Sequence, residues 1–269
     1  MKTGKITALL LVLITISASL YAQEKELVVT YKYDKVHLRY EDLKSKEPIK
    51  DNESTKFFKV YTYENFCLRQ VGIRVAGRID FKSGFTVMDT TYKHNLVDYT
   101  KGQMWHIASI QNAEFARYVK EPLNLFKWKF EAVTKDILGY KCAKATCTFR
   151  GRDYVAFFTR ELPFKAAPWK FHALPGVVLE VYSTDNIVKW EAQSLKVRHR
   201  QPHPEIPSAS DEVITLKEYL KLLKHSKLNE EDGHNKTILK FPDFSEQLKL
   251  THKNSNLPNS IEIFDLDKP

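Results

Sequence analysis

The sequence predicts a mainly β protein, a β-rich α+β fold in which a curved antiparallel sheet or half-barrel has a C-terminal helix packed on it. Two observations support this prediction. Most of the chain consists of short segments in which apolar and polar residues alternate, the pattern of half-buried strands. Only one stretch, beginning at Thr215, combines a helix-start signal with apolar residues at helical spacing.

The first 22 residues have the composition of a secretory signal peptide. Lys2 and Lys5 give a positive start, residues 6–16 form an apolar run too short to span a bilayer, and small residues lead to Ala22. We expect cleavage after Ala22 and export to the periplasm, the cell surface or the extracellular space. Cleavage lowers the net charge from +9 to +7. For an exported protein this charge favours anionic surfaces or glycans over nucleic acid, and no later segment is apolar enough to span a membrane.

The first part of the mature chain has the pattern of successive strands. Residues 26–33 alternate apolar and polar side chains and predict a first strand. Residues 42–55 are charged and polar and predict a loop. A second strand is expected at 57–63, with further extended pieces within 66–91. Residues 94–122 have mixed periodicity, which leaves open a helix or two short strands.

The most regular part of the chain is 137–195, which we interpret as four strands in two hairpins. A Pro-rich corner from Pro163 to Gly176 joins the hairpins, because proline cannot donate to a strand ladder. Turn signals at 150–153 and 184–186 close the two hairpins. A half-buried strand is expected just before this region, at 126–132.

These strands form one predicted antiparallel β domain at 23–200. Residues 201–269 are expected to contain a Pro-rich linker, a helix near 215–225 and a C-terminal segment that packs on the β domain or wraps it. Thr215 and Glu218 have the spacing of a capping box. The apolar stripe expected to face the sheet consists of Leu216, Tyr219, Leu220 and Leu223.

The three cysteines are Cys67, Cys142 and Cys147, and an exported protein can hold a disulfide. Cys142 and Cys147 would lie on opposite faces of a straight strand, about 16 Å apart, so their pairing requires a bulge or bend. Pairing of Cys67 with either one is the alternative. One thiol is left over in each case. We expect a structural role for the cysteines because no histidine stands in a recognisable partner motif.

Two groups of residues are candidates for ligand contact. The corner combines prolines, aromatic rings, a lysine and a glycine, and could form either the rim of a groove or a buried structural corner. Of these two readings we favour the structural one. Its members are Pro168, Trp169, Lys170, Phe171, Leu174, Pro175 and Gly176. The second group is Arg150 and Arg152 at the first hairpin turn, which could contact an anion.

Signature motifs of common enzymes are absent from the sequence. It contains no Ser nucleophile elbow, no HExxH zinc motif, no Walker loop and no dinucleotide fingerprint. His199 and His203, with Glu205 nearby, have atoms able to bind a metal, but Pro202 and Pro204 exclude the helix on which such spacing usually works. We therefore expect no metal, no cofactor and no catalytic residues.

Part of the regular region resembles the GLPGLI family, a group of secreted proteins typical of Bacteroidetes. The residues that match its motif are Gly139, Tyr140, Cys142, Ala145, Phe149, Gly151, Arg152, Ala156, Glu161, Pro163, Pro168, Lys170, Phe171, Leu174, Pro175 and Gly176. The chain departs from the family pattern at Phe157, where Trp is usual, and at Val177-Val178, where Leu-Ile is usual. It also has Ala167 and Ala173 in place of two glycines. The resemblance implies export and a mainly β fold, but no activity.

These observations predict an exported, non-enzymatic binding or interaction protein of the periplasm or cell envelope. Its ligand or partner is expected to be apolar, a glycan or a peptide. An apolar ligand would need a cavity on the concave face of the sheet, lined by Phe130, Phe158 and Leu179. The alternative is a secreted hydrolase with a Cys/His site, which would need a free thiol close to a histidine.

Overall fold

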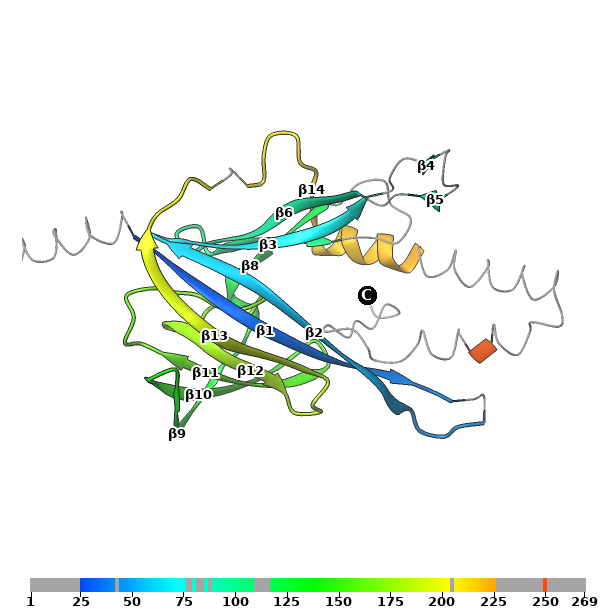
Figure 1. Cartoon of the computed structure of the whole chain (residues 1–269), viewed down its shortest axis with the longest axis horizontal. Helices are drawn as coiled ribbons and strands as arrows, with labels where there is room; N and C mark the ends of the chain where they lie inside the picture. The colour runs from blue at the N-terminus through cyan, green and yellow to red at the C-terminus, as the bar shows by residue number, and fades with distance from the viewer. Residues whose placement is uncertain are drawn as a thin grey trace, which may run out of the picture.

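One sheet of twelve strands makes up most of the described chain in the computed structural model (Figure 1). The structure describes residues 25–41, 44–75, 79–80, 85–86, 89–108, 117–203, 206–225 and 249–250. The strand order is β14-β8-β7-β6-β3-β2-β1-β13-β12-β11-β10-β9, and β4 with β5 forms a separate pair. Every pairing in the large sheet is antiparallel except that of β14 with β8. The mainly β prediction is confirmed.

The bounds of the elements follow the chain in order. They are β1 (Lys25–Arg39), β2 (Ile49–Tyr63), β3 (Phe66–Val75), β4 (Ile79–Asp80), β5 (Phe85–Thr86), β6 (Asp89–Asp98), β7 (Gln103–Ala108), β8 (Arg117–Pro122), the 3-10 helix η1 (Leu123–Leu125), β9 (Lys129–Ile137), β10 (Tyr140–Phe149), β11 (Arg152–Thr159), β12 (Val177–Ser183), β13 (Val188–His199) and β14 (Val213–Thr215).

The second strand is longer than the sequence predicted. Residues 42–55 were expected to form a loop, but β2 begins at Ile49, and its first residues pair with the end of β1 between Asp34 and Arg39. Most of this part of β2 is exposed, so its polar sequence lacks the alternation of apolar and polar residues that indicates a strand. In Figure 1 the β1–β2 ribbon projects beyond the rest of the sheet.

The segment from 94 to 122 belongs to the sheet. The end of β6, the whole of β7 and the whole of β8 lie in it, so the helical alternative is wrong for the residues described there. Helix η1 follows β8 and carries the chain to β9, at the opposite end of the strand order. The strand predicted at 126–132 therefore starts later, at Lys129. Phe126 is instead buried in the core before the strand begins.

The two predicted hairpins are confirmed. They consist of β10 with β11 and of β12 with β13, and β11 also pairs with β12. The side chains of β11 and β12 are buried on both faces of the sheet, apart from the exposed Asp153 and the half-buried Tyr182. These buried side chains divide between two clusters, one that includes Phe171 and Trp190 and one that includes Leu27 and Tyr31. Burial on both faces explains why this region is so apolar.

The predicted helix is present at residues 216–225. Its capping box is formed in both directions, because the amide of Glu218 donates to Thr215 Oγ1 and the amide of Thr215 donates to the Glu218 carboxylate. Leu216, Tyr219 and Leu222 pack against Val119 and Ile214, whereas the predicted stripe had Leu220 and Leu223 in place of Leu222. Strand β14 joins this segment to the sheet beside β8.

Two predicted segments lie outside the described residues. These are the signal peptide at 1–22 and nearly all of the C-terminal segment after the helix. Within the described part of the chain, no helix combines the length and apolar character needed to cross a bilayer.

The corner between the hairpins depends on unusual backbone conformations. Trp169 and Ala173 have φ values of 51° and 72°, in the left-handed region that favours glycine. Ala173 is one of the two positions where the GLPGLI pattern has glycine. Gly176 has φ 143°, and a Cβ at this position would lie 2.0 Å from the carbonyl oxygen of Thr159. Gly176 is therefore required for β12 to start beside the end of β11.

We expect Gly176→Ala to lower the free energy of unfolding by about 4 kcal/mol or more, because it adds a backbone clash to conformational strain. Gly102→Ala is the matched control. Gly102 also has a positive φ, but its Cβ would meet no atom within 4 Å, so we expect a loss of about 1–2 kcal/mol. Urea denaturation measures both values. Equal losses in the two variants would contradict this account of Gly176.

Candidate ligand-binding site

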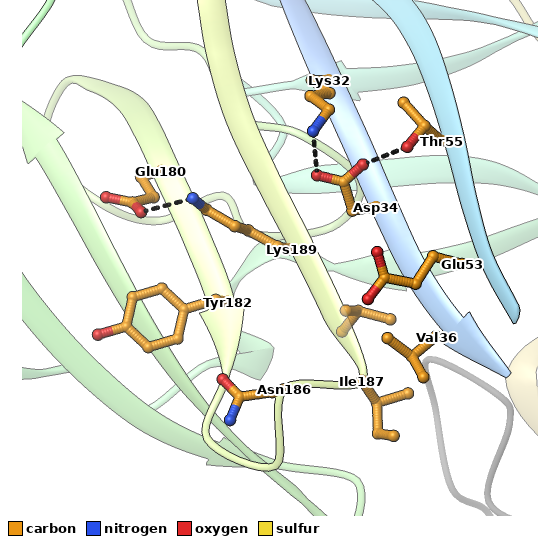
Figure 2. A pocket seen from close by; sticks show the side chains of 11 residues that line it. Lys32, Asp34, Val36, Glu53, Thr55, Glu180, Tyr182, Asn186, Ile187 and Lys189 are labelled. Atoms are coloured by element: carbon orange, nitrogen blue, oxygen red, sulfur yellow. Dashed lines mark hydrogen bonds and ion pairs between the residues drawn. The ribbon is translucent and has the colours of Figure 1, made fainter. Parts of the chain in front are cut away.

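A cavity of about 440 Å³ lies where β1 and β2 meet the β12–β13 hairpin (Figure 2). Its volume is in the range typical of small-ligand sites. Tyr33 pairs with Trp190, and their rings stack 4.9 Å apart on one face of the sheet. The next pair, Asp34 and Lys189, points to the opposite face because successive strand residues alternate. We call these the inner face and the outer face, and the cavity is on the outer face.

The charged groups that line the cavity are mostly paired with one another. Asp34 forms an ion pair of 2.8 Å with Lys32 and accepts a 2.6 Å hydrogen bond from the Thr55 hydroxyl. Burial acts to raise the pKa of Asp34, but these two contacts outweigh it, and the pKa is lowered. Glu180 is bound by Lys189 at 3.4 Å and by Lys135. Most of the lining charge is thus neutralised within the protein.

Three polar groups remain available at the rim. Glu53, Tyr182 and Asn186 line the cavity, and Figure 2 shows their side chains without a partner among the residues drawn. Asn186 has φ 59° in the β12–β13 turn, a left-handed conformation that Asn tolerates better than most residues. Val36, Ile187 and Val188 add apolar surface. The cavity therefore offers a carboxylate, a phenol and an amide to a ligand.

The predicted corner residues do not line this cavity. Phe171 is fully buried in the inner-face cluster, with its ring centroid 4.9 Å from those of Trp169 and Tyr154 and 5.0 Å from that of Trp190. The other corner positions are buried (Pro168, Lys170, Leu174, Gly176), half-buried (Trp169) or exposed (Pro175). The corner thus contributes aromatic packing rather than a rim around the outer cavity.

Arg150 and Lys170 meet at a residue that the sequence did not point to. Both bind the buried carboxylate of Glu121 on β8, Lys170 at 2.6 Å. Burial lowers the pKa of Lys170 to about 8. Burial also acts to raise the pKa of Glu121, but Lys170, His106 and Arg150 together lower it. Arg152 is instead paired with Asp185. Both arginines predicted to contact an anion are therefore bound to carboxylates of the protein.

The three cysteines are buried and free, so the possible disulfide among them is not formed. Cys142 and Cys147 belong to clusters on opposite faces of β10, which keeps their thiols apart. Burial raises the pKa of Cys67 to about 12, that of Cys142 to about 11 and that of Cys147 to about 12. Such thiols stay protonated at neutral pH, whereas the thiolate is the nucleophile in cysteine chemistry.

A tyrosine connects one of these thiols with a histidine. The Tyr99 hydroxyl lies 2.9 Å from Nδ1 of His172 and also interacts with the Cys67 thiol. Burial lowers the pKa of His172 to about 4, so this imidazole is neutral at pH 7. The arrangement is a buried polar chain that satisfies its own members.

The cavity that an apolar ligand would need, lined by Phe130, Phe158 and Leu179, is not formed by these residues. Phe130 is 58% exposed, and its ring centroid lies 5.9 Å from that of Phe158, which packs in the cluster around Phe171, whereas Leu179 packs in a different cluster with Leu27 and Tyr31. These three side chains therefore do not share a cavity. No group of three or more potential metal ligands occurs among the residues that the structure describes.

The family model described as "N-glycanase peptide, N-terminal domain" (PNGase F-II N) matches residues 84–220, just over half of the chain. The chain belongs to this N-glycanase N-terminal domain family. The match includes the whole of the regular region at 137–195, but neither the family model nor the solved structures test the resemblance to the GLPGLI family, which stays a prediction. No curated protein matches the chain.

Two solved structures of PNGF-II, in space groups C2 and P21, are similar to this N-glycanase N-terminal domain family member. Each is 15% identical to it and covers 75% of the chain, with TM-scores of 0.49 and 0.51. At 15% identity, the similarity to the P21 structure, with its TM-score of 0.51, shows a shared fold and nothing more. The chain spans only about one third of the length of these structures, 33% and 34%.

We expect Glu121→Gln to lower the free energy of unfolding by about 3 kcal/mol, because it removes the carboxylate that Lys170 and Arg150 share in a buried site. The matched control is Glu212→Gln, which disrupts the ion pair of Arg117 with a half-exposed carboxylate and should cost less than about 1 kcal/mol. Chemical denaturation at pH 7 measures both. A loss in Glu121→Gln no larger than in the control would contradict the assigned role of Glu121.

His172 should make the protein sensitive to acid. Its folded pKa of about 4 is below the ordinary value of 6.5, so the unfolded chain binds the proton first as the pH falls. Stability is retained above pH 6.5 and declines between pH 6.5 and 4, by about 2 kcal/mol at pH 5. His172→Gln should remove this part of the decline in denaturation measured at pH 7 and pH 5. The exposed His225, changed to Gln, is the control. Identical pH profiles for both variants would show that His172 titrates normally.

Proposed function

We propose that this protein is an exported, non-enzymatic binding protein that holds a neutral, hydroxyl-rich ligand, a glycan or the glycan of a glycopeptide, in the outer cavity. One observation carries the proposal. The charged groups of the lining are largely paired with one another, while Glu53, Tyr182 and Asn186 stay available at the rim. Ionic ligands gain little from such a site, whereas hydroxyl groups can both donate to the carboxylate and accept from the amide and phenol.

Two further observations support a glycan over the other ligand classes considered. The family to which the chain belongs is named for an N-glycanase, and a protein of that kind acts on glycans attached to asparagine. The aromatic ring of Tyr182 supplies a flat apolar surface beside polar groups, and sugar rings have both characters. An apolar ligand is disfavoured because Phe130, Phe158 and Leu179 do not line a shared cavity.

A hydrolase that uses a Cys/His site is the less favoured alternative. The raised pKa values of the three thiols disfavour a cysteine nucleophile, and Tyr99 lies between Cys67 and His172. Export remains an inference from the residues at 1–22, supported by the resemblance to the GLPGLI family. Together these points favour a role in recognition at the periplasm or cell surface.

Binding of an N-linked glycopeptide, measured by isothermal titration calorimetry, tests this function against the same peptide without its glycan. We expect heat of binding only with the glycopeptide. Glu53→Gln and Tyr182→Ala should each weaken binding by about tenfold, because each removes a rim contact with the ligand. Glu212→Gln, on a distant strand end, should bind as the unmodified protein does.

Two results would overturn the proposal. One is equal binding of the glycosylated and bare peptides, which would indicate a peptide-binding protein. The other is glycopeptide binding that neither rim substitution weakens, which would place the glycan elsewhere on the surface.

A further inference from the structure

A row of hydrogen-bond donors crosses the inner face, on the opposite side of the sheet from the cavity. Arg69 on β3 is paired with Val60, which is itself paired with Val29 of β1, so these residues share the inner face with Tyr31 and Tyr33. On its other side Arg69 is paired with Asn95 of β6. His106 of β7 comes next, because Leu96 and Trp105 are the neighbouring pair.

Arg69 is a half-buried cation without a carboxylate partner among the described residues. Its guanidinium lies 4.9 Å from the centre of the Phe58 ring, and its Nε is buried with no hydrogen-bond partner. Burial lowers its pKa to about 10, and the nearby group that acts against this is the phenol of Tyr33. A buried charge without a counter-charge is unfavourable unless something else supplies one.

Asn95, paired with Arg69 across the strands, adds a side-chain amide to this row. Pairing between β6 and β7 ends at Leu96 and Trp105, so the chains separate beyond this point. The Asn95 Oδ1 atom accepts a 2.8 Å hydrogen bond from the amide of Ile107 and replaces the lost ladder contact. The oxygen is used by this bond, and the amide NH₂ group remains to donate.

His106 adds a further polar atom without a partner. The residue is only 9% exposed, and Nδ1 is 3.3 Å from Glu121 Oε2 but forms no hydrogen bond. The charge of Glu121 is already matched by Lys170 and Arg150. The surroundings of His106 are therefore rich in positive charge, and burial together with Lys170 lowers its pKa to about 3.

We propose that Arg69, Asn95 and His106 form a binding site for a single anionic group, a carboxylate, sulfate or phosphate. The guanidinium supplies charge and directional donors, and the amide and imidazole add neutral donors beside it. An anion here would satisfy the buried Nε of Arg69 and balance its charge. This site is independent of the outer cavity and does not rest on the proposed glycan ligand.

Thermal unfolding in sodium sulfate, sodium phosphate or sodium acetate, compared with sodium chloride at equal ionic strength, tests the site. We expect a saturable rise in Tm with at least one of the three anions and a smaller rise with chloride. In Arg69→Gln the apparent affinity should fall by about tenfold or more, because a charge-assisted contact is lost. Arg39→Gln is the matched control, since Arg39 is an exposed arginine paired with Asp51 at 2.9 Å.

A second variant keeps the test informative if Arg69→Gln folds poorly. Asn95→Asp places a carboxylate beside Arg69 while retaining the oxygen that accepts from Ile107. We expect this variant to be more stable than the unmodified protein without added anion and to lose the anion-specific rise in Tm.

Three outcomes would overturn the proposal. The first is an unmodified protein whose Tm responds equally to all salts at the same ionic strength. The second is an anion-specific rise of the same size in Arg69→Gln and Arg39→Gln. The third is an Asn95→Asp variant that is destabilised and still responds to anions, which would show that the Arg69 guanidinium is balanced in another way.

Discussion

The carboxylate of Glu121 is the interaction on which the shape of the sheet depends. Glu121 is on β8, the second strand from one end of the sheet, while Arg150 is at the β10–β11 turn near the other end. The two side chains can meet only if the sheet curves until its ends approach. Lys170 binds the same carboxylate from the corner between the hairpins. Both cations are needed, because a carboxylate this deeply buried is stable only when its charge is matched.

The short connection through η1 also requires the sheet to curve. Only a short segment separates β8 from β9, although these strands lie near opposite ends of the strand order. Phe126, just after η1, packs 4.1 Å from the Phe149 ring and 5.4 Å from the Phe171 ring, as measured between ring centroids. The aromatic cluster therefore fills the space that the curved sheet encloses. This explains why the aromatic residues of the corner serve packing and do not line the outer cavity.

Sequence periodicity predicted the parts of the fold in which each residue's environment is set by its near neighbours. The hairpins at 137–195 and the helix with its Thr215 cap were predicted because alternation and capping are local signals. The exposed start of β2 gave no such signal, since a strand with both faces in water does not need apolar residues. The Glu121 cluster could not be predicted either, because its partners lie 29 and 49 residues away along the chain.

The candidate sites were missed for a related reason. Lys32 and Glu180 stand at polar positions of predicted strands, and Asp34 directly follows the first of these strands. The sequence alone shows only that such polar positions face away from the core. That they line one cavity depends on the pairing of β1 with both β2 and β13, which brings distant segments together. Arg69 was hidden in the same way, as a charged residue in a strand whose neighbours were not known.

The two proposed sites, one on each face of the sheet, would use two different kinds of recognition. In the proposed outer-face site the charges are largely paired, so a ligand would be held by short-range hydrogen bonds and by fit, which salt screens little. In the proposed inner-face site Arg69 has no paired charge among the described residues, so an anion would be held mainly by electrostatic attraction in a partly desolvated place. Because strand residues alternate, the same β1–β3 segment supports both faces. A substitution on one face can therefore change one kind of binding without altering the other.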